Sequence, residues 1–261
     1  MNVLIICINF NSYKELRRYI DSIDVAVKAC PEINVKVVIG DNSSDYQDFV
    51  YGNSSKLQIL QQRFDNVGYM GAAQAILNPV DKKLYDFFII SNVDITMDSS
   101  FFTRLMNARI SKDVAWIAPS IKSLLIGRDK NPSVLERYPK WKLVVLKYTY
   151  NRFVLPLYEK VYYNKKSTTV DKEMDIYAGH GSFFLLTSSF FEKYDKIDYP
   201  MFLYGEELYF AELIRSVNMK VRYIPSLLIY DYEHVSTSLI KRKTYYTYNK
   251  KALNYILKRF Y

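Results

Sequence analysis

Short apolar strands alternate with amphipathic helices over the first 118 residues, and this alternation limits the possible folds more than any other feature. The apolar runs that predict strands span residues 3–8, 35–40, 57–60, 86–90 and 114–118. Helical spacing of apolar residues predicts helices at 11–23, 68–77 and 99–110. Apolar strands separated by amphipathic helices indicate an α/β fold, with a mostly parallel central sheet and helices on both faces.

The alternation stops between residues 119 and 174, where basic and aromatic residues dominate the sequence. It returns with the stretch 174–187, a predicted helix at 205–217 and a predicted strand at 220–225. The second half ends in another polar cluster, YDYEHVSTS, and begins no new alternation. We therefore expect it to complete the first half.

The formal net charge of +9 calls for an anionic partner. Residues 241–261 hold seven Lys or Arg and no acidic residue, and residues 139–166 mix Lys and Arg with Trp, Tyr, Leu and Val. Such a mixture suits an anionic membrane surface, and we expect contact through 139–166 and 241–259. A solvated helix face packed on the body of the protein is the alternative reading of these stretches.

Cys7 and Cys30 form no disulfide framework and have no metal-ligand spacing, so we expect two reduced thiols of a cytoplasmic protein. The N-terminus MNVLIICINF lacks the basic lead of a signal peptide. No apolar run approaches the roughly 18–20 residues that span a bilayer. The expected location is the cytoplasm, at the inner face of the cell membrane.

Polar residues follow several predicted strands at their carboxyl ends, where open α/β sheets bind ligands. Asp41 follows the strand 35–40 and could accept hydrogen bonds from a nucleobase or ribose, or form an ordinary turn. Asp94 follows the strand 86–90 in FFIISNVDI; it could hold a divalent cation or cap a helix. Asn92 could orient a water molecule or a phosphate oxygen.

Further candidates lie in loops. Gly68 and Gly71 open a helix that could approach phosphates, although the spacing matches neither the phosphate loop nor the dinucleotide fingerprint. Glu206 and Glu207 begin a helix, where acids complement the helix dipole or, if partly buried, act as a general base. His180 and His234 are the two histidines, and each could be a core or surface residue or a ligand of a metal or phosphate.

Seven segments in this order resemble the family 2 glycosyltransferases with the GT-A fold, especially the bacterial rhamnosyltransferase-like enzymes of surface-polysaccharide synthesis (O-antigen, capsule). These segments are VLIICINFNSYKELRRYIDSI, VVIGDNSSD, DNVGYMGAA, FFIISNVDI, GHGSFFLLTSSFFEKYDKID, MFLYGEELYFAELIRSVNMKVRYIP and YEHVSTS. The resemblance fails only across residues 119–174. It implies a single GT-A catalytic domain at 1–238, followed by a basic C-terminal helix at 239–261. Within the domain, 1–118 is the nucleotide-binding half, 119–174 a variable basic, aromatic helical insertion, and 175–238 the acceptor and catalytic half.

The resemblance also implies an inverting transfer of a sugar from a UDP- or dTDP-sugar to a hydroxyl of a glycan or lipid-linked glycan, with Mg²⁺ or Mn²⁺. It assigns Glu207 as catalytic base with Glu206 beside it, and Asp94 and His234 to the metal. The residues assigned to the nucleotide and donor are Asn9, Asn11, Asp41, Asn66, Gly68 and Asn92. The residues assigned to the acceptor or sugar side are His180, Gly181, Ser182 and Tyr204. Asn92 stands in the first carboxylate position of the family's D-x-D motif.

Two other functions fit parts of the sequence. A sugar-nucleotide pyrophosphorylase would need a glycine-rich, basic loop after the first strand, and INFNSYKEL contains no glycine. A nucleic-acid-binding protein would fit the pI of about 9.2. However, Asp41, Asp94, Glu206 and Glu207 would face the same crevice and repel phosphate in the absence of a metal, so we expect no nucleic-acid partner.

Overall fold

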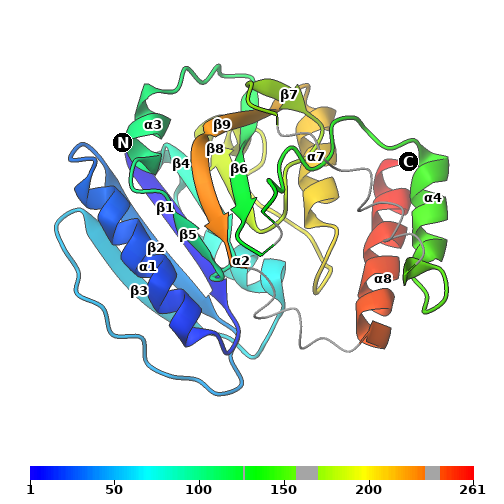
Figure 1. The fold of residues 1–261 in the computed structure, drawn as a ribbon, viewed down its shortest axis with the longest axis horizontal. Coiled ribbons are helices and arrows are strands. Elements are labelled where there is room, and N and C mark those ends of the chain that lie inside the picture. The colour runs from blue at the N-terminus through cyan, green and yellow to red at the C-terminus, as the bar shows by residue number, and fades with distance from the viewer. Residues whose placement is uncertain (126, 157–169, 233–241) are drawn as a thin grey trace.

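The computed structural model describes residues 1–125, 127–156, 170–232 and 242–261. Within these ranges nine strands form one sheet, in the order β3-β2-β1-β4-β8-β6-β9-β5, with β7 paired to β9 (Figure 1). The strands are β1 Asn2–Asn9, β2 Asn34–Asp41, β3 Leu57–Arg63, β4 Phe87–Ser91, β5 Ile95–Met97, β6 Val114–Ser123, β7 Met174–Ile176, β8 Phe183–Thr187 and β9 Lys220–Asp231.

Helices cover both faces of this sheet, as the sequence predicts (Figure 1). They are α1 Tyr13–Lys28, α2 Tyr69–Leu77, the short 3₁₀ helix η1 Lys82–Leu84, α3 Phe101–Asn107, α4 Lys140–Thr149, α6 Ser188–Phe191, α7 Glu206–Ser216 and α8 Arg242–Phe260. Successive residues of β1 point to opposite faces of the sheet. Val3, Ile5 and Cys7 pack with α1 and α3. Leu4, Ile6 and Ile8 pack with the cluster formed by α2, α7 and α8.

The first half of the sheet is parallel, as predicted: β1 pairs with β2 and β4, and β2 with β3, all in parallel. The second half is mixed. β8 lies between β4 and β6 and runs antiparallel to both, whereas β6 and β9 are parallel. The chain therefore enters β8 at the end of the sheet where β4 and β6 leave it. Hydropathy along the sequence does not reveal that reversal of direction.

Three strands differ from the sequence-based expectation in extent. β6 continues to Ser123 instead of ending at 118, β9 continues to Asp231 instead of ending at 225, and the short β5 was not predicted. The register between β6 and β9 shifts at Pro119, so the two strands bend and then continue pairing. The extension carries β9 to the end of the sheet where β1, β2 and β4 also finish.

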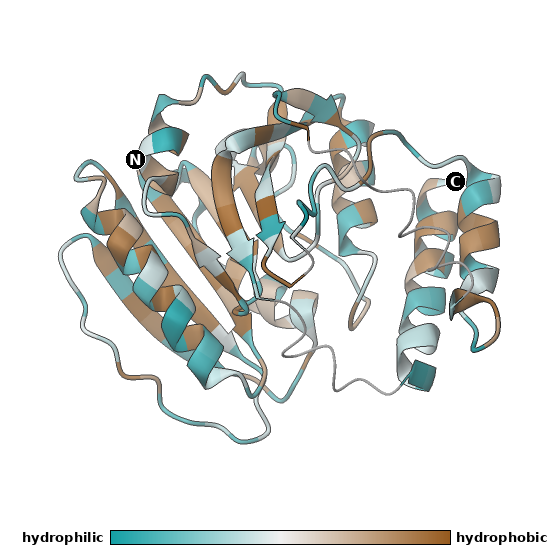
Figure 2. Ribbon diagram, viewed as in Figure 1, coloured by the Kyte–Doolittle hydropathy of each residue, from teal (hydrophilic) through white to brown (hydrophobic). Residues whose placement is uncertain are grey.

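The basic stretches are partly packed on the body. One face of α8, with Asn249, Ala252, Leu253 and Ile256, is buried, and α8 contacts both α4 and α7 (Figures 1 and 2). Within the described residues, none of the helices is both long and apolar enough to cross a membrane. Cys7 and Cys30 are buried thiols and are not disulfide-bonded, which agrees with the expectation of reduced cysteines.

Candidate active site

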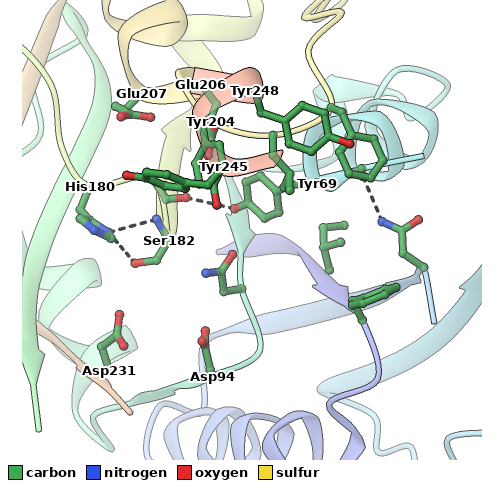
Figure 3. Close-up of a pocket in the computed structure, with 18 of the residues that line it drawn as sticks. Tyr69, Asp94, His180, Ser182, Tyr204, Glu206, Glu207, Asp231, Tyr245 and Tyr248 are labelled. Atoms are coloured by element: carbon green, nitrogen blue, oxygen red, sulfur yellow. Dashed lines mark hydrogen bonds between the residues drawn. The ribbon is translucent and has the colours of Figure 1, made fainter. Parts of the chain in front are cut away.

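A cavity of about 710 Å³ opens beyond the carboxyl ends of β1, β2 and β4 (Figure 3). The N-terminal end of β8, the start of α7, the end of β9 and the start of α8 complete its walls. The cavity brings together most of the site residues predicted from the sequence. Those that line it are Asn66, Gly68, Asn92, Asp94, His180, Gly181, Ser182, Tyr204, Glu206 and Glu207.

Asp94 lies in the tight connection between β4 and β5, where Tyr232 donates its backbone N–H to the Asp94 carbonyl at 3.0 Å. The residue is only 6% exposed, and its Oδ1 atom is buried with no hydrogen-bond partner. Burial, and after it the negative charge of Asp231, raise the pKa of the Asp94 carboxyl. An orphaned carboxylate oxygen facing a cavity is a suitable ligand for a cation.

Asp231 was not predicted as a site residue, yet it lines the same cavity at the end of β9. It is 3% exposed, and its Oδ2 accepts an ion-pair hydrogen bond from Lys130 Nζ at 2.9 Å. The available signal was an acid directly after an apolar strand, the same pattern that identified Asp94. It was missed because the strand was expected to end at residue 225. Figure 3 shows Asp94 and Asp231 together on one side of the cavity.

Glu206 and Glu207 form the first turn of α7, on the side of the cavity away from Asp94 (Figure 3). Glu206 Oε2 is buried without a hydrogen-bond partner. Burial, followed by the charge of Glu207, raises the pKa of Glu206 to about 8, and burial also raises the pKa of Glu207. Gly181 packs against the pair: a Cβ there would lie 3.3 Å from Glu206 Oε1 and 3.4 Å from Glu207 Oε2.

His180 and Ser182 form a hydrogen-bonded corner of the cavity (Figure 3). The backbone N–H of Ser182 donates to His180 Nδ1 at 3.2 Å, and Ser182 Oγ lies 2.9 Å from the same nitrogen. The His180 backbone N–H donates to Asn131 Oδ1 at 2.8 Å, which ties this corner to the segment after β6. The imidazole is therefore held by its Nδ1 side, with its orientation fixed at the cavity wall.

The loop before α2 is shaped by its backbone conformation. Gly68 has φ of +82°, and a Cβ there would lie 2.3 Å from the carbonyl oxygen of Phe202, so only glycine fits. Asn66 also adopts a left-handed conformation, with φ of 38°. Asn42, which lines the cavity after β2, donates its side-chain N–H to the Gly68 carbonyl at 3.0 Å. This loop therefore brings backbone and amide groups to the cavity.

Asn9, Asn11 and Asp41 do not line the cavity. Asp41 is fully buried, and its carboxylate accepts hydrogen bonds from Asn9, Tyr13, Gln61 and the backbone of Ser43. Asn11 holds the same loop through Ser44 and the backbone of Asp45. The expectation that Asp41 faces the ligand is thus not met by its geometry, because its acceptor capacity is used within the protein. His234 lies outside the described residues.

Aromatic residues from the C-terminal helix form a wall that was not predicted. Tyr245 and Tyr248 of α8 line the cavity with Phe202 and Tyr204 from the loop before α7 (Figure 3). Tyr204 packs edge-on against Tyr245, with ring centroids 5.1 Å apart, and Phe202 packs against Tyr248 at 5.3 Å. The charge of α8 suggested a surface role for this helix, and its aromatic residues drew no separate prediction.

The fold resembles solved glycosyltransferase structures at low sequence identity. TarS from S. aureus matches with a TM-score of 0.56 and 12% identity over 89% of this chain and 37% of that chain. TarS 1–349 in complex with UDP-GlcNAc matches with 0.57 and 11%, over 92% and 62%. GalNAc-T7 with UDP, GalNAc and Mn²⁺ matches with 0.55 and 10%, over 90% and 44%.

These matches confirm the predicted α/β, GT-A-like fold. The chain spans between 37% and 62% of the length of these three structures. No family model and no curated protein matches the sequence.

Proposed function

We propose that this protein is an inverting glycosyltransferase that moves a sugar from a UDP- or dTDP-sugar to a hydroxyl of a glycan or lipid-linked glycan. One observation carries the proposal: a single cavity holds a buried, unpartnered carboxylate oxygen at Asp94 and, across from it, the buried carboxylate pair Glu206–Glu207. Direct displacement needs a group at the leaving diphosphate and a base at the attacking hydroxyl. The bound UDP-sugar of TarS 1–349, on the same fold, supports this proposal.

The metal of the proposal is Mg²⁺ or Mn²⁺, held by Asp94, and the Mn²⁺ of GalNAc-T7 supports it. The orphaned Oδ1 atom of Asp94 fits a hard cation, which typically takes one or two protein carboxylates together with substrate phosphates. When bound, the ion neutralises the charge that develops on the leaving diphosphate. His234, the second ligand implied by the family resemblance, lies outside the described residues.

Glu207 is the proposed general base, which takes the proton of the acceptor hydroxyl as it attacks the anomeric carbon. Its raised pKa brings its proton affinity closer to the operating pH, which favours proton transfer. Burial and the charge of Glu207 raise the pKa of Glu206, which favours the protonated form of Glu206 beside the proposed base.

The donor side of the proposed site consists of Asn66, Gly68 and Asn92, all of which line the cavity. Asn9, Asn11 and Asp41 act one layer behind them, by holding the loop that carries Asn42. The acceptor side consists of His180, Gly181, Ser182 and Tyr204. Tyr245 and Tyr248 extend this side as aromatic faces suited to the apolar face of a sugar ring.

The proposed partner outside the cavity is an anionic membrane. The protein would bind its acceptor at the cytoplasmic face of this membrane. Trp141, Val145 and Tyr148 of α4 are 68%, 53% and 66% exposed and follow the i, i+4, i+7 spacing of one helix face. Lys140, Lys142 and Lys147 belong to the same helix. We call Trp141, Val145 and Tyr148 the α4 stripe.

The test is hydrolysis of a panel of nucleotide sugars by the purified protein with Mn²⁺, with Mg²⁺ or with EDTA. We expect one donor to release nucleoside diphosphate with metal and not with EDTA. Asp94→Asn should abolish this release, and Asp113→Asn, in an exposed ion pair with Lys220, should leave it unchanged. Absence of turnover with every donor, together with absence of metal-dependent binding of UDP or dTDP in calorimetry, would refute the proposal.

A further inference from the structure

We propose that Asp231 is a second carboxylate of the metal site and that Lys130 is a built-in cation which competes with the metal for Asp231. This inference rests on the proposed function, because it names residues of the same site. Asp231 is opposite Ile95 in the antiparallel pairing of β5 with β9. The neighbouring hydrogen bond from Tyr232 N–H to the Asp94 carbonyl fixes the two acids beside each other.

Both carboxylates belong to one cavity wall and both are buried, with Asp94 6% and Asp231 3% exposed. Their side chains point into the cavity from neighbouring segments (Figure 3). Lys130 lines the same cavity and brings one positive charge against two negative ones. Two buried carboxylates that lie beside each other repel, and a bound cation relieves this repulsion. The unpartnered Asp94 Oδ1 is where such a cation can bind.

Lys130 is held in place by an anchored loop. Its own backbone N–H donates to the Ile121 carbonyl at 2.8 Å. The preceding Asp129 accepts hydrogen bonds from the backbone of Ile121 at 2.9 Å, from the backbone of Asn131 at 2.9 Å and from Tyr223 OH at 3.2 Å. The Lys130 side chain is only 18% exposed. The anchored loop therefore positions the Lys130 ammonium against Asp231, whereas the ion pair of an exposed surface lysine is only weakly held.

The ion pair and a metal ion require the same carboxylate. A hard divalent ion binds oxygen ligands at about 2.0–2.6 Å, and an ammonium 2.9 Å from Asp231 Oδ2 would lie close to such an ion. Like charges repel, so metal binding at Asp231 displaces Lys130. The flexible lysine stem lets the ammonium move to a neighbouring anion, and the diphosphate of the donor is the anion expected in this cavity.

The test measures binding of Mn²⁺ alone by electron paramagnetic resonance of the free ion, without nucleotide. We expect Asp231→Asn and Asp94→Asn each to weaken Mn²⁺ binding by about tenfold or more. Lys130→Met should strengthen it severalfold, because Asp231 loses its competitor. In a second measurement with Mn²⁺ at saturation, Lys130→Met should weaken UDP binding.

The control pair is Lys220–Asp113, a Lys–Asp ion pair at the start of β9, far along the strand from Asp231. Asp113→Asn and Lys220→Met should leave Mn²⁺ binding as in the wild type. Circular dichroism identifies variants that fail to fold, and Lys130→Met still tests the competition if Asp231→Asn does not fold. The inference is overturned if Lys130→Met fails to strengthen Mn²⁺ binding, or if folded Asp231→Asn binds Mn²⁺ as the wild type does.

The two proposals fail separately in these experiments. If Mn²⁺ binding depends on Asp94 and Asp231 but no nucleotide sugar is turned over, the proposed metal site is supported and the proposed transferase activity is refuted. Metal-dependent turnover with unchanged Mn²⁺ binding in Asp231→Asn would remove only the present inference.

Discussion

Acidic residues of α7 experience opposite electrostatic environments. Glu206 is buried in the cavity wall beside Glu207, and its pKa is raised to about 8. Glu212 is fully buried, but hydrogen bonds from Arg137, Tyr177 and Arg215 outweigh the effect of burial and lower its pKa. On this one helix, ionised Glu206 therefore destabilises the fold and ionised Glu212 stabilises it.

The first residue-scale prediction concerns Glu206→Gln. A raised carboxyl pKa means that the native state holds its proton more tightly than the unfolded state does. Stability therefore falls as pH rises from the ordinary value of 4.5 through about 8. At pH 9 we expect the variant to be more stable than the wild type by about 2 kcal/mol or more, and at about pH 4 to be nearly equal to it. Urea denaturation at both pH values measures the difference.

Glu212→Gln is the matched control on the same helix, and its sign is opposite. A lowered pKa contributes stability above the unfolded value, and this contribution disappears as pH falls through the folded value. Loss of the charge also leaves Arg137 and Arg215 without their carboxylate, so we expect destabilisation by about 3 kcal/mol at pH 9. If both variants were destabilised at pH 9, the burial argument for Glu206 would be wrong.

At this scale the sequence predicted the acids that directly follow or precede a recognisable element. Asp94 follows an apolar strand and Glu207 begins an amphipathic helix, and both line the cavity. Asp41 shows the same local pattern, yet its side chain turns into the protein, because neighbouring donors satisfy it. Local sequence does not specify those donors, since Gln61 comes from another strand. Lys130 was not predicted for the same reason: its partner is distant in sequence.

At the scale of elements, Gly205 joins the loop of the cavity to α7 and α8. It precedes Glu206 with φ of +80°. A Cβ at this position would lie 2.8 Å from the Tyr199 hydroxyl and 2.9 Å from the Ala252 Cβ of α8. The contact explains how a C-terminal helix packed at one side fixes the first turn of α7, and with it the position of the acidic pair.

We predict that Gly205→Ala destabilises the protein by about 1–3 kcal/mol, because the left-handed conformation and the close contact both oppose a methyl group. The thermal unfolding temperature should fall, and donor hydrolysis should slow because Glu207 is displaced. Gly52→Ala is the control, since a Cβ there has no neighbour within 4 Å. Unchanged unfolding of Gly205→Ala would show that α8 does not constrain α7.

The helices and the first strands followed from periodicity, but the strand ends did not. β9 was expected to end at Pro225, and proline does weaken strand pairing. Instead the register shifts beside it, and pairing resumes from Leu228 to Asp231. β5 has three residues and depends on β9 for its pairing, so its own sequence carries little signal. Pairing between strands that are distant in sequence determined both where β9 ends and where β5 forms.

At the scale of the whole molecule, the α4 stripe and the basic charge predict binding to anionic vesicles. Trp141→Ala together with Tyr148→Ala should lower the partition coefficient on phosphatidylglycerol vesicles by about tenfold or more, because each side chain loses its apolar burial in the interface. Both residues are about two-thirds exposed, so the fold should tolerate the change.

Val50→Ala is the control for this measurement, since Val50 is 78% exposed but lies in the loop between β2 and β3. Raised salt should weaken wild-type binding, because the lysines contribute through charge. If the double variant and the wild type sediment equally with vesicles, the α4 stripe does not mediate membrane binding.

The central position of β8 has a consequence for how this chain becomes a protein. During synthesis the first four strands emerge long before β8, so β4 is at first an open edge whose residues Phe88, Ile89 and Ile90 are fully buried in the finished sheet. An exposed apolar edge attracts the strands of neighbouring chains. A fragment that ends at Ser123 would therefore aggregate, and the first half of this chain is not a portable module that could be exchanged between proteins of this fold.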